Sequence, residues 1–290
     1  MILMRRFVIQ CVVVLYKQSP KESEALSSLV RICSSEALLA SQIAILVHDN
    51  SPQAQEYVLD SSEPAEHICI EYHHAPANLG LAHAYNCALA LARECSIPWL
   101  LLLDQDTRVT KQFLIQLLES LGEASTQECC AFVPQLVFND LVLSPQIVNK
   151  VFYQRMPIGF SGLASKRLVA FNSGACIRVS SLMAIGGFPN EFWLDYLDHM
   201  IFHSLQESGG RVFVLDSRLE HSLSVADLES NVSHERYGNL LQAEWMFVRK
   251  TKWGGGPLIH RIRLLKRAIS HFLKLRNKSY ALQTLRSACS

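Results

Sequence analysis

The chain has 290 residues, of which 49% are hydrophobic and 18% are charged. This composition excludes a disordered protein and allows one large folded domain or two small ones. The formal net charge of +1 gives no indication of nucleic-acid binding. The charges are uneven, however, because residues 245–290 hold 11 of the 27 Lys and Arg residues and no Asp or Glu. An acidic body therefore precedes a basic tail.

The nine cysteines are scattered along the chain, and the adjacent pair Cys129 and Cys130 has no zinc-binding spacing. We expect reduced, mostly buried thiols in a reducing cytoplasm. Residues 1–16 have the charges and the apolar run of a signal peptide but are followed by no small-residue cleavage site. A buried parallel strand explains this run better. No other stretch approaches the roughly 20 apolar residues that cross a bilayer. We therefore expect a cytoplasmic protein that is soluble or bound to a membrane surface.

Strand-like and helix-like patterns alternate through the first half of the chain. The strand-like runs are 7–16, 43–48, 68–72 and 99–103, and the helix-like runs are 22–39, 81–94 and 111–121. This alternation predicts an α/β fold with a mainly parallel sheet covered by helices. In such sheets ligands bind beyond the carboxyl ends of the strands. Polar residues follow all four strands, at 16–18, 49–50, 73–80 and 104–106.

Two carboxylates, Asp104 and Asp106, follow an apolar strand directly. A hard cation such as Mg²⁺ or Mn²⁺ can bridge protein carboxylates to a pyrophosphate. The same residues also fit a polar strand end, or a helix cap formed by Asp106 or Thr107. The adjacent His73 and His74 are a weaker metal candidate, because neighbours on a strand point to opposite faces. We expect one of these rings to face solvent and the other the core.

Several short motifs follow one another in a specific order. They are residues 12–16, 48–51, 78–82, 103–106, 172–177, 186–188 and 191–198, followed by His221. Together they resemble glycosyltransferase family 2 over roughly residues 7–225. The Asp-Gln-Asp and Phe-x-x-Asp-Tyr-x-Asp stretches are similar to its bacterial rhamnosyltransferase branch. The resemblance implies a GT-A (Rossmann-like) domain, which we place at residues 1–250, with a basic, amphipathic helical C-terminal extension at 251–290.

The resemblance also implies a nucleotide site. Tyr16 and Asp49 would flank the nucleoside, with Asp49 accepting a hydrogen bond from the base. Asn78 and Gly80 would lie against the nucleotide, where glycine permits close approach of the backbone. Asp104 would contact the metal-bound diphosphate.

The metal site implied by the resemblance consists of Asp104, Asp106 and His221, with Mg²⁺ or Mn²⁺ as the ion. His221 is equally compatible with a structural histidine. Asp198 aligns with the catalytic base of the family. Asp195 lies three residues earlier, so the two carboxylates would share a helix face, unless Asp195 only favours the helix N-terminus.

The stretch Asn172, Ser173 and Gly174 matches a sugar and acceptor pocket, although a plain turn before a strand at 175–179 explains it nearly as well. After Asp198, the second acid and the arginine found in many family members are missing. This departure puts the acceptor contacts, and activity itself, in question.

The function implied is an inverting, metal-dependent transfer of a sugar to a glycan or lipid-linked acceptor in surface polysaccharide or lipopolysaccharide synthesis. Rhamnose from dTDP-rhamnose is the expected donor sugar. One alternative keeps the fold but uses a UDP-hexose. Another is a non-catalytic partner protein with a nucleotide-sugar fold.

The basic tail predicts an amphipathic helix over residues 258–278. Its apolar positions share one face, and cationic side chains occupy much of the rest: Leu258, Ile262, Leu265, Ile269, Phe272 and Leu273 against seven Lys and Arg residues. Such a helix binds anionic membrane surfaces peripherally, here the inner face of the plasma membrane. Packing on the body or against a second copy is the alternative.

Overall fold

The computed structural model describes residues 7–55, 68–123, 126–139, 141–149, 152–220, 228 and 232–289. Within these residues a nine-stranded sheet has the order β3-β2-β1-β4-β11-β5-β12-β9, with β6 paired to β5, and a second sheet has the order β10-β7-β8. The strands are β1 (Ile9–Leu15), β2 (Ile43–Asp49), β3 (Cys69–His74), β4 (Trp99–Asp104), β5 (Cys129–Phe138), β6 (Leu141–Ser144), β7 (Gln146–Val148), β8 (Tyr153–Arg155), β9 (Gly162–Leu163), β10 (Leu168–Val169), β11 (Cys176–Arg178) and β12 (Arg211–Glu220).

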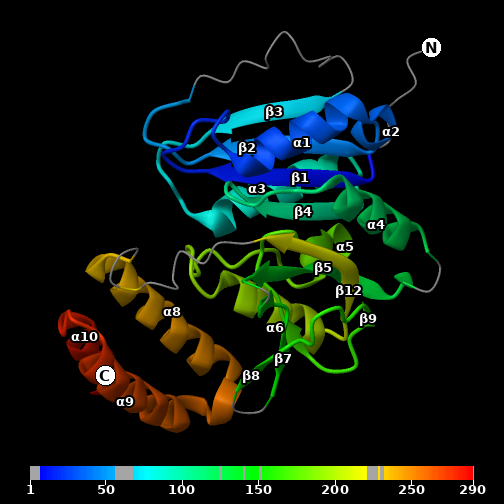
Figure 1. Cartoon of the computed structure of the whole chain (residues 1–290). Coiled ribbons are helices and arrows are strands. Elements are labelled where there is room, and N and C mark those ends of the chain that lie inside the picture. Colours follow the sequence, from blue (N-terminus) through cyan, green and yellow to red (C-terminus); the bar gives the residue numbers. More distant parts are fainter. Residues whose placement is uncertain are drawn as a thin grey trace.

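Helices cover both faces of the main sheet (Figure 1). They are α1 (Glu24–Ser35), α2 (Ala37–Ala40), α3 (Leu81–Glu94), α4 (Lys111–Gly122), α5 (Val179–Ala184), α6 (Leu197–Glu207), α8 (His234–Thr251), α9 (Gly256–Lys274) and α10 (Ser279–Cys289), with a 3₁₀ turn at Trp253–Gly255. Side chains of β1 alternate between the faces. Val12 and Val14 join the core with α3, whereas Cys11 and Val13 join the core with α1 and α4. The mainly parallel α/β fold predicted from the sequence is confirmed.

The order of the strands brings the predicted polar clusters together. All seven residues of β1 are buried, as expected for a central parallel strand. β1 lies between β2 and β4, parallel to both, with Leu15 opposite Asp49 and Val14 opposite Asp104. The carboxyl ends of the three strands therefore meet at one edge of the sheet.

Two predicted helices are shorter than the sequence pattern indicated. The run 22–39 is divided into α1 and α2 because Glu36 leaves the helical conformation, with φ −130° and ψ 82°. The run 258–278 ends as a helix at Lys274, since Leu275 is extended, and α10 begins at Ser279. Apolar periodicity alone predicts no break at either point.

The last three helices form a unit with its own small core. Tyr237 and Trp245 of α8 pack with Leu264 of α9 and Tyr280 of α10. Phe247 of α8 instead joins the core of the body, so α8 connects the two parts. None of the helices in the described ranges combines the length and the apolarity needed to cross a membrane. The division at residue 250 remains a prediction.

Candidate active site

A cavity of about 380 Å³ opens where β1, β2 and β4 end. Five of the residues predicted for the nucleotide and metal sites line it: Tyr16, Asn78, Gly80, Asp104 and Asp106. Segments much later in the chain complete the wall with Trp193, Leu194 and Arg236. The cavity therefore lies at the edge of the sheet where the strand-end rule predicts a ligand, and we name it the donor cavity after the nucleotide donor that the sequence resemblance implies.

Asp104 lines the donor cavity, and both of its carboxylate oxygens contact hydroxyl groups. Oδ2 accepts a hydrogen bond from Oγ of Ser173, and Oδ1 lies 3.4 Å from the hydroxyl of Tyr85. Tyr85 is fully buried. Burial, followed by the charge of Asp104, raises the pKa of Tyr85 well above its usual value, so this hydroxyl remains a donor. These contacts orient Asp104.

Asp106 is exposed and does not cap a helix. The cap of α4 is Thr110, whose side chain accepts a hydrogen bond from the amide of Phe113 at 3.2 Å. Between the two aspartates, Oε1 of Gln105 accepts a hydrogen bond from the amide of Tyr16 at 2.8 Å and joins the ends of β4 and β1.

The chemistry of this loop fits a hard divalent cation. Asp104 and Asp106 line the same cavity, and carboxylate oxygens are the ligands that Mg²⁺ and Mn²⁺ prefer. The predicted third ligand, His221, lies outside the described residues.

Asp49 is fully buried, and its carboxylate is already engaged within the chain. Oδ1 accepts a hydrogen bond from the amide of Ser51 at 2.8 Å, and Oδ2 accepts one from the hydroxyl of Tyr72 at 2.5 Å. Burial alone would raise the pKa of Asp49, but these hydrogen bonds outweigh it and lower the pKa. Asp49 thus orders the turn after β2, and its neighbour Asn50 lines the cavity.

Asn78 and Gly80 form a wall of the donor cavity together with Trp193. Both have positive φ, 43° and 90° respectively. The indole Nε1 of Trp193 donates to the carbonyl of Asn78 at 3.1 Å, and the carbonyl of Trp193 accepts from the amide of Leu81 at 2.8 Å. The sequence expectation was that Gly80 allows close approach of a nucleotide. In the structure it allows close approach of Trp193.

The prediction that Asp195 and Asp198 share one face of a helix is wrong. α6 begins at Leu197, and Tyr196 before it is left-handed with φ 62°, so Asp195 precedes the helix. The two carboxylates nevertheless interact. Burial, opposed by Arg236 and reinforced by the charge of Asp198, raises the pKa of Asp195.

Asp198 lies in the first turn of α6 with only 17% of its side chain exposed. Its Oδ1 accepts hydrogen bonds from the amide of His199 at 2.7 Å and from the ring Nδ1 of His199 at 2.8 Å. Both bonds use one oxygen, so the carboxylate is held in a defined orientation.

Arg236 is a residue of the donor cavity that no sequence motif predicted. It lies in the first turn of α8, where Oγ of Ser233 caps the helix and accepts from the Arg236 amide at 3.2 Å. Its guanidinium lies 3.6 Å from Oδ1 of Asp195 and lines the donor cavity. No motif spacing connects Arg236 with Asp195. The only local indication in the sequence was the stretch from Ser233 to Arg236, in which the serine is typical of a helix start.

A second cavity of about 580 Å³ begins at His199, beside Asp198. Its lining includes Tyr153 and Trp253, whose rings stack 4.4 Å apart at 10°. No pattern in the sequence predicts this cavity, because Tyr153 and Trp253 lie far apart in the chain.

The stretch Asn172–Ser173–Gly174 lies behind Asp104 and supports it. The hydroxyl of Ser173 provides the contact described above. Gly174 has a φ of 79°, its amide donates to the carbonyl of Leu102 at 2.8 Å, and a Cβ there would lie 2.8 Å from Pro134. The segment is thus a tight turn before β11 and also reaches the site through Ser173.

The two adjacent histidines diverge as expected. The ring of His74 contacts the carbonyl of Ser51 at 2.9 Å, whereas the ring of His73 lies against His48 on the opposite face of β3. His73 is the exposed member of the pair.

Solved structures with the same fold include several glycosyltransferases. Residues 1–349 of S. aureus TarS in complex with UDP-GlcNAc match with a TM-score of 0.56 at 12% identity, over 97% of this chain and 71% of that one. The mannosyltransferase PcManGT from Pyrobaculum calidifontis, in complex with GDP-Man and Mn²⁺, matches with 0.53 at 15% identity, over 98% and 74%. GalNAc-T7 with UDP, GalNAc and Mn²⁺ matches with 0.55 at 13% identity, over 97% and 55%.

These likenesses show a GT-A fold. A search of curated proteins found no match. The family model for glycosyl transferase family 2 matches residues 24–177, which include α1, the ends of β2 and β4 at the donor cavity and the first two residues of β11. Since this match covers more than half of the chain, the protein belongs to glycosyl transferase family 2.

Proposed function

We propose that this glycosyltransferase is an inverting, metal-dependent enzyme that transfers a sugar from a nucleoside-diphosphate donor to a glycan or lipid-linked acceptor. One observation carries the proposal. A single cavity joins Tyr16, Asn50 and Asn78 on the nucleoside side with Asp104 and Asp106 on the diphosphate side. Rhamnose from dTDP-rhamnose is the donor that the Phe-x-x-Asp-Tyr-x-Asp stretch favours, and a UDP-hexose is the alternative.

Asp104 and Asp106 would hold Mg²⁺ or Mn²⁺ together with the diphosphate oxygens. Two of the similar structures contain Mn²⁺, which supports this assignment. When bound, the ion would neutralise the charge that develops on the leaving diphosphate. Ser173 and Tyr85 fix Asp104 by hydrogen bonds and thereby set the position of its carboxylate.

Arg236 provides a second cationic group for the diphosphate. A guanidinium presents several donors in a plane and matches phosphate oxygens well. Asp195 lies 3.6 Å away and keeps the side chain of Arg236 at the cavity. Asp195 is therefore a positioning residue in this proposal.

Asp198 acts as the base. The acceptor hydroxyl oxygen forms a bond to the anomeric carbon, the bond from that carbon to the diphosphate oxygen breaks, and the hydroxyl proton moves to the Asp198 carboxylate. The two hydrogen bonds from His199 to Oδ1 orient the group and leave the proton to be accepted at Oδ2.

The acceptor would approach through the second cavity, because His199 lines it and contacts Asp198. Aromatic side chains such as Tyr153 and Trp253 offer the apolar faces that sugar rings pack against. Asn172, Ser173 and Gly174 would face the transferred sugar from the Asp104 side.

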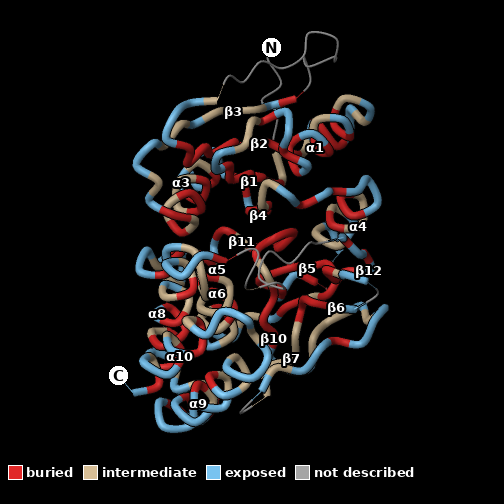
Figure 2. The backbone as a smooth tube through the Cα atoms, turned by 60° about the vertical axis from the view of Figure 1, so that its left-hand side comes forward, coloured by how far each residue is buried: buried red, intermediate tan, exposed pale blue. Residues whose placement is uncertain are grey.

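We further propose that the C-terminal unit binds an anionic membrane surface, where a lipid-linked acceptor is found. α9 buries His260 against Trp245 of α8 and Leu264 in the core of the C-terminal unit, and much of the rest of α9 is exposed (Figure 2). Leu258, Ile269 and Leu273 are 70%, 62% and 75% exposed. Exposed cationic residues flank these side chains, and residues 245–290 contain no acidic residue to repel anionic lipid.

Calorimetry of the full chain with UDP and dTDP, each with and without Mn²⁺, tests the proposed function. We expect binding that requires the metal, with the tighter nucleotide identifying the donor base. Absence of binding by either nucleotide in both conditions contradicts the proposal. Nucleotide binding without any sugar transfer would instead support the non-catalytic alternative.

A further inference from the structure

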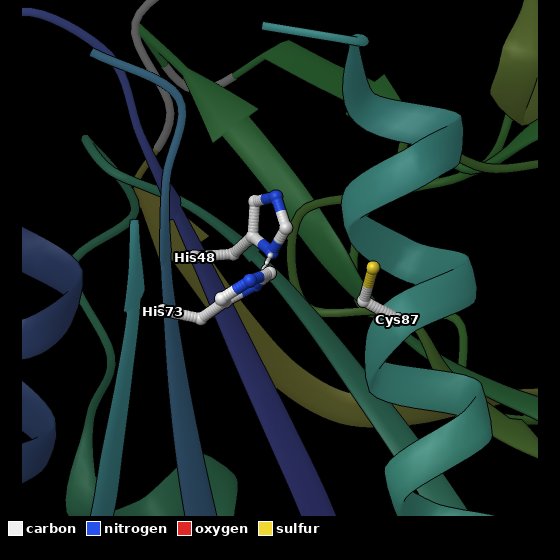
Figure 3. Close-up of side chains that lie close together, drawn as sticks. All are labelled: His48, His73 and Cys87. Carbon is white, nitrogen blue, oxygen red and sulfur yellow. Dashed lines mark hydrogen bonds between the residues drawn. The ribbon is translucent and has the colours of Figure 1, made fainter. Parts of the chain in front are cut away.

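A cluster of nitrogen and sulfur side chains lies between the sheet and α3, apart from the carboxylates of the donor cavity. Figure 3 shows His48 on β2 and His73 on β3 turned toward Cys87 on α3. His48 and His73 are directly paired in the parallel register of β2 and β3, so their rings leave the same face of the sheet.

The distances within this cluster suit a tetrahedral metal ion. Nδ1 of His48 lies 3.2 Å from Nδ1 of His73. Two nitrogens bound to one Zn²⁺ at about 2.0 Å in tetrahedral geometry are about 3.3 Å apart. The ligand atoms of His48, His73 and Cys87 all lie within 4.8 Å of one another. A modest side-chain rotation of Cys87 would complete a three-ligand set.

A fourth donor lies beside the cluster. His83 precedes Cys87 by one helical turn, so both side chains share a face of α3. Nε2 of His83 lies 3.6 Å from Sγ of Cys87, close to the about 3.5 Å expected for a nitrogen and a sulfur on one tetrahedral Zn²⁺. The rings of His48 and His83 have centroids 6.0 Å apart. His83 or a water molecule can therefore occupy the fourth position.

The surroundings of His48 also favour a ligand. The residue is fully buried, and its ring lies beside the rings of His73 and His83. Nε2 of His48 and Oδ1 of Asn50 are both buried, and each is unpaired within the described part of the chain. Metal-bound histidines usually donate the second ring N–H to such a carbonyl, and Asn50 follows His48 by two residues.

We propose that His48, His73 and Cys87 bind Zn²⁺. Imidazole and thiolate are ligands that zinc accepts and that Mg²⁺ disfavours, so this ion differs from the one proposed at Asp104 and Asp106. On binding, the Cys87 thiol releases its proton to solvent and no redox change occurs. His73 is exposed and provides the route of entry.

A bound ion would connect β2 and β3 to α3. The first turn of α3 carries Leu81, and with Gly80 before it Leu81 lines the donor cavity. His48 also immediately precedes Asp49 and Asn50 at the same edge of the sheet. The zinc site would therefore stabilise one wall of the donor cavity without contacting the donor.

The test uses the metal-free full chain titrated with Co²⁺ and then Zn²⁺, without nucleotide. We expect one equivalent of Co²⁺ with a thiolate-to-cobalt absorption band, displacement by Zn²⁺, and a higher Tm with Zn²⁺. His73→Ala should weaken binding by about 100-fold or more, since even loss of an outer partner costs 10–100-fold. Cys87→Ser should abolish the thiolate band.

Two matched variants control for indirect effects. His74→Ala changes the adjacent ring on the other face of β3, and Cys95→Ser changes an exposed thiol just beyond α3. Both should bind like the wild type. A wild-type spectrum without a thiolate band would overturn the proposal. Equal losses of Co²⁺ affinity in His73→Ala and His74→Ala would also overturn it. The absorption band requires a sulfur ligand, so Co²⁺ bound at Asp104 and Asp106 would not produce it. The band therefore reports only Co²⁺ bound with a thiolate.

Discussion

The indole of Trp193 packs directly over Gly80, so that a Cβ on residue 80 would lie 2.4 Å from Cδ1 of Trp193. This contact joins the loop before α3 to the segment before α6, and both segments line the donor cavity. The hydrogen bonds from Trp193 to Asn78 and from Leu81 to Trp193 strengthen the same connection. The shape of this wall of the donor cavity therefore depends on a glycine and a tryptophan that are far apart in sequence.

Gly80→Ala should weaken both the fold and donor binding. The new methyl group would meet backbone and ring atoms of Trp193 at a φ of +90°, and strain of this kind costs about 1–3 kcal/mol. Urea unfolding and nucleotide calorimetry measure the two effects. Gly122→Ala is the matched control, because a Cβ at Gly122 meets nothing within 4 Å. Equal behaviour of the two variants would contradict the role of the Trp193 contact.

Asp198→Asn should retain donor binding and lose transfer. An amide keeps the shape of the side chain but accepts no proton, and general-base catalysis contributes about 10²–10⁴-fold to rates. Calorimetry measures nucleotide binding and identifies the donor base, and turnover is then measured with the corresponding sugar donor. Asp216→Asn, at an exposed position of β12, should leave both unchanged. Transfer by Asp198→Asn at close to the wild-type rate would show that another group is the base.

Arg236→Ala should weaken binding of the nucleoside diphosphate by about 10–100-fold, since hydrogen bonds to charged groups contribute about 1.5–3 kcal/mol. Binding of the nucleoside without phosphates should not change. Arg236→Lys should recover part of the loss, because it keeps the charge but not the planar donors. Arg249→Ala, on the same helix but exposed elsewhere, is the control. If the affinities for nucleoside and diphosphate fall together, Arg236 acts on the fold rather than on the phosphates.

Asp195→Asn should make the protein more stable at neutral pH. Folding raises the pKa of Asp195, so the folded protein binds more protons than the unfolded chain. The Asp195 carboxyl therefore lowers the free energy of unfolding as pH rises above its unfolded pKa of about 3.9. The advantage of the variant should therefore disappear at lower pH. Urea midpoints measured across pH test this.

Glu191→Gln should change the stability in the opposite direction to Asp195→Asn. A hydrogen bond from Lys250 at 2.6 Å lowers the pKa of Glu191, so its stabilising contribution is present above the unfolded pKa and is lost as pH falls. This variant should be the less stable one at neutral pH. A lower urea midpoint for Asp195→Asn at neutral pH would show that its pairing with Arg236 outweighs burial.

The double variant Ile269→Gln and Leu273→Gln should lose binding to anionic liposomes while keeping the fold. Both side chains are exposed on α9, so their loss removes apolar insertion but little internal packing. Co-sedimentation at moderate salt with and without anionic lipid is the measurement. Leu38→Gln, which changes a residue 73% exposed on α2, is the control. Equal recovery of the wild-type chain with both kinds of lipid would contradict membrane binding.

Much of the fold was predictable because local patterns encode it. The apolar run of β1, which only Gln10 interrupts, predicted a buried parallel strand, and the amphipathic spacing of α3 predicted its bounds correctly. The position of Asp104 and Asp106 followed from the rule that parallel strands end at one edge. The division of the helix at Glu36 and the start of α6 after Asp195 were not predictable in this way, because both depend on single backbone conformations.

The sequence by itself determined the four strands of the first half, their direction and the edge where polar residues gather, since these follow from the period of apolar residues and from strand ends. Only the tertiary structure decided which distant residues meet there. Arg236 reaches Asp195 from α8, and His48 meets His73 through strand register and Cys87 across the packing of α3. Periodicity records which face a residue takes, whereas its partner is set by how the elements pack.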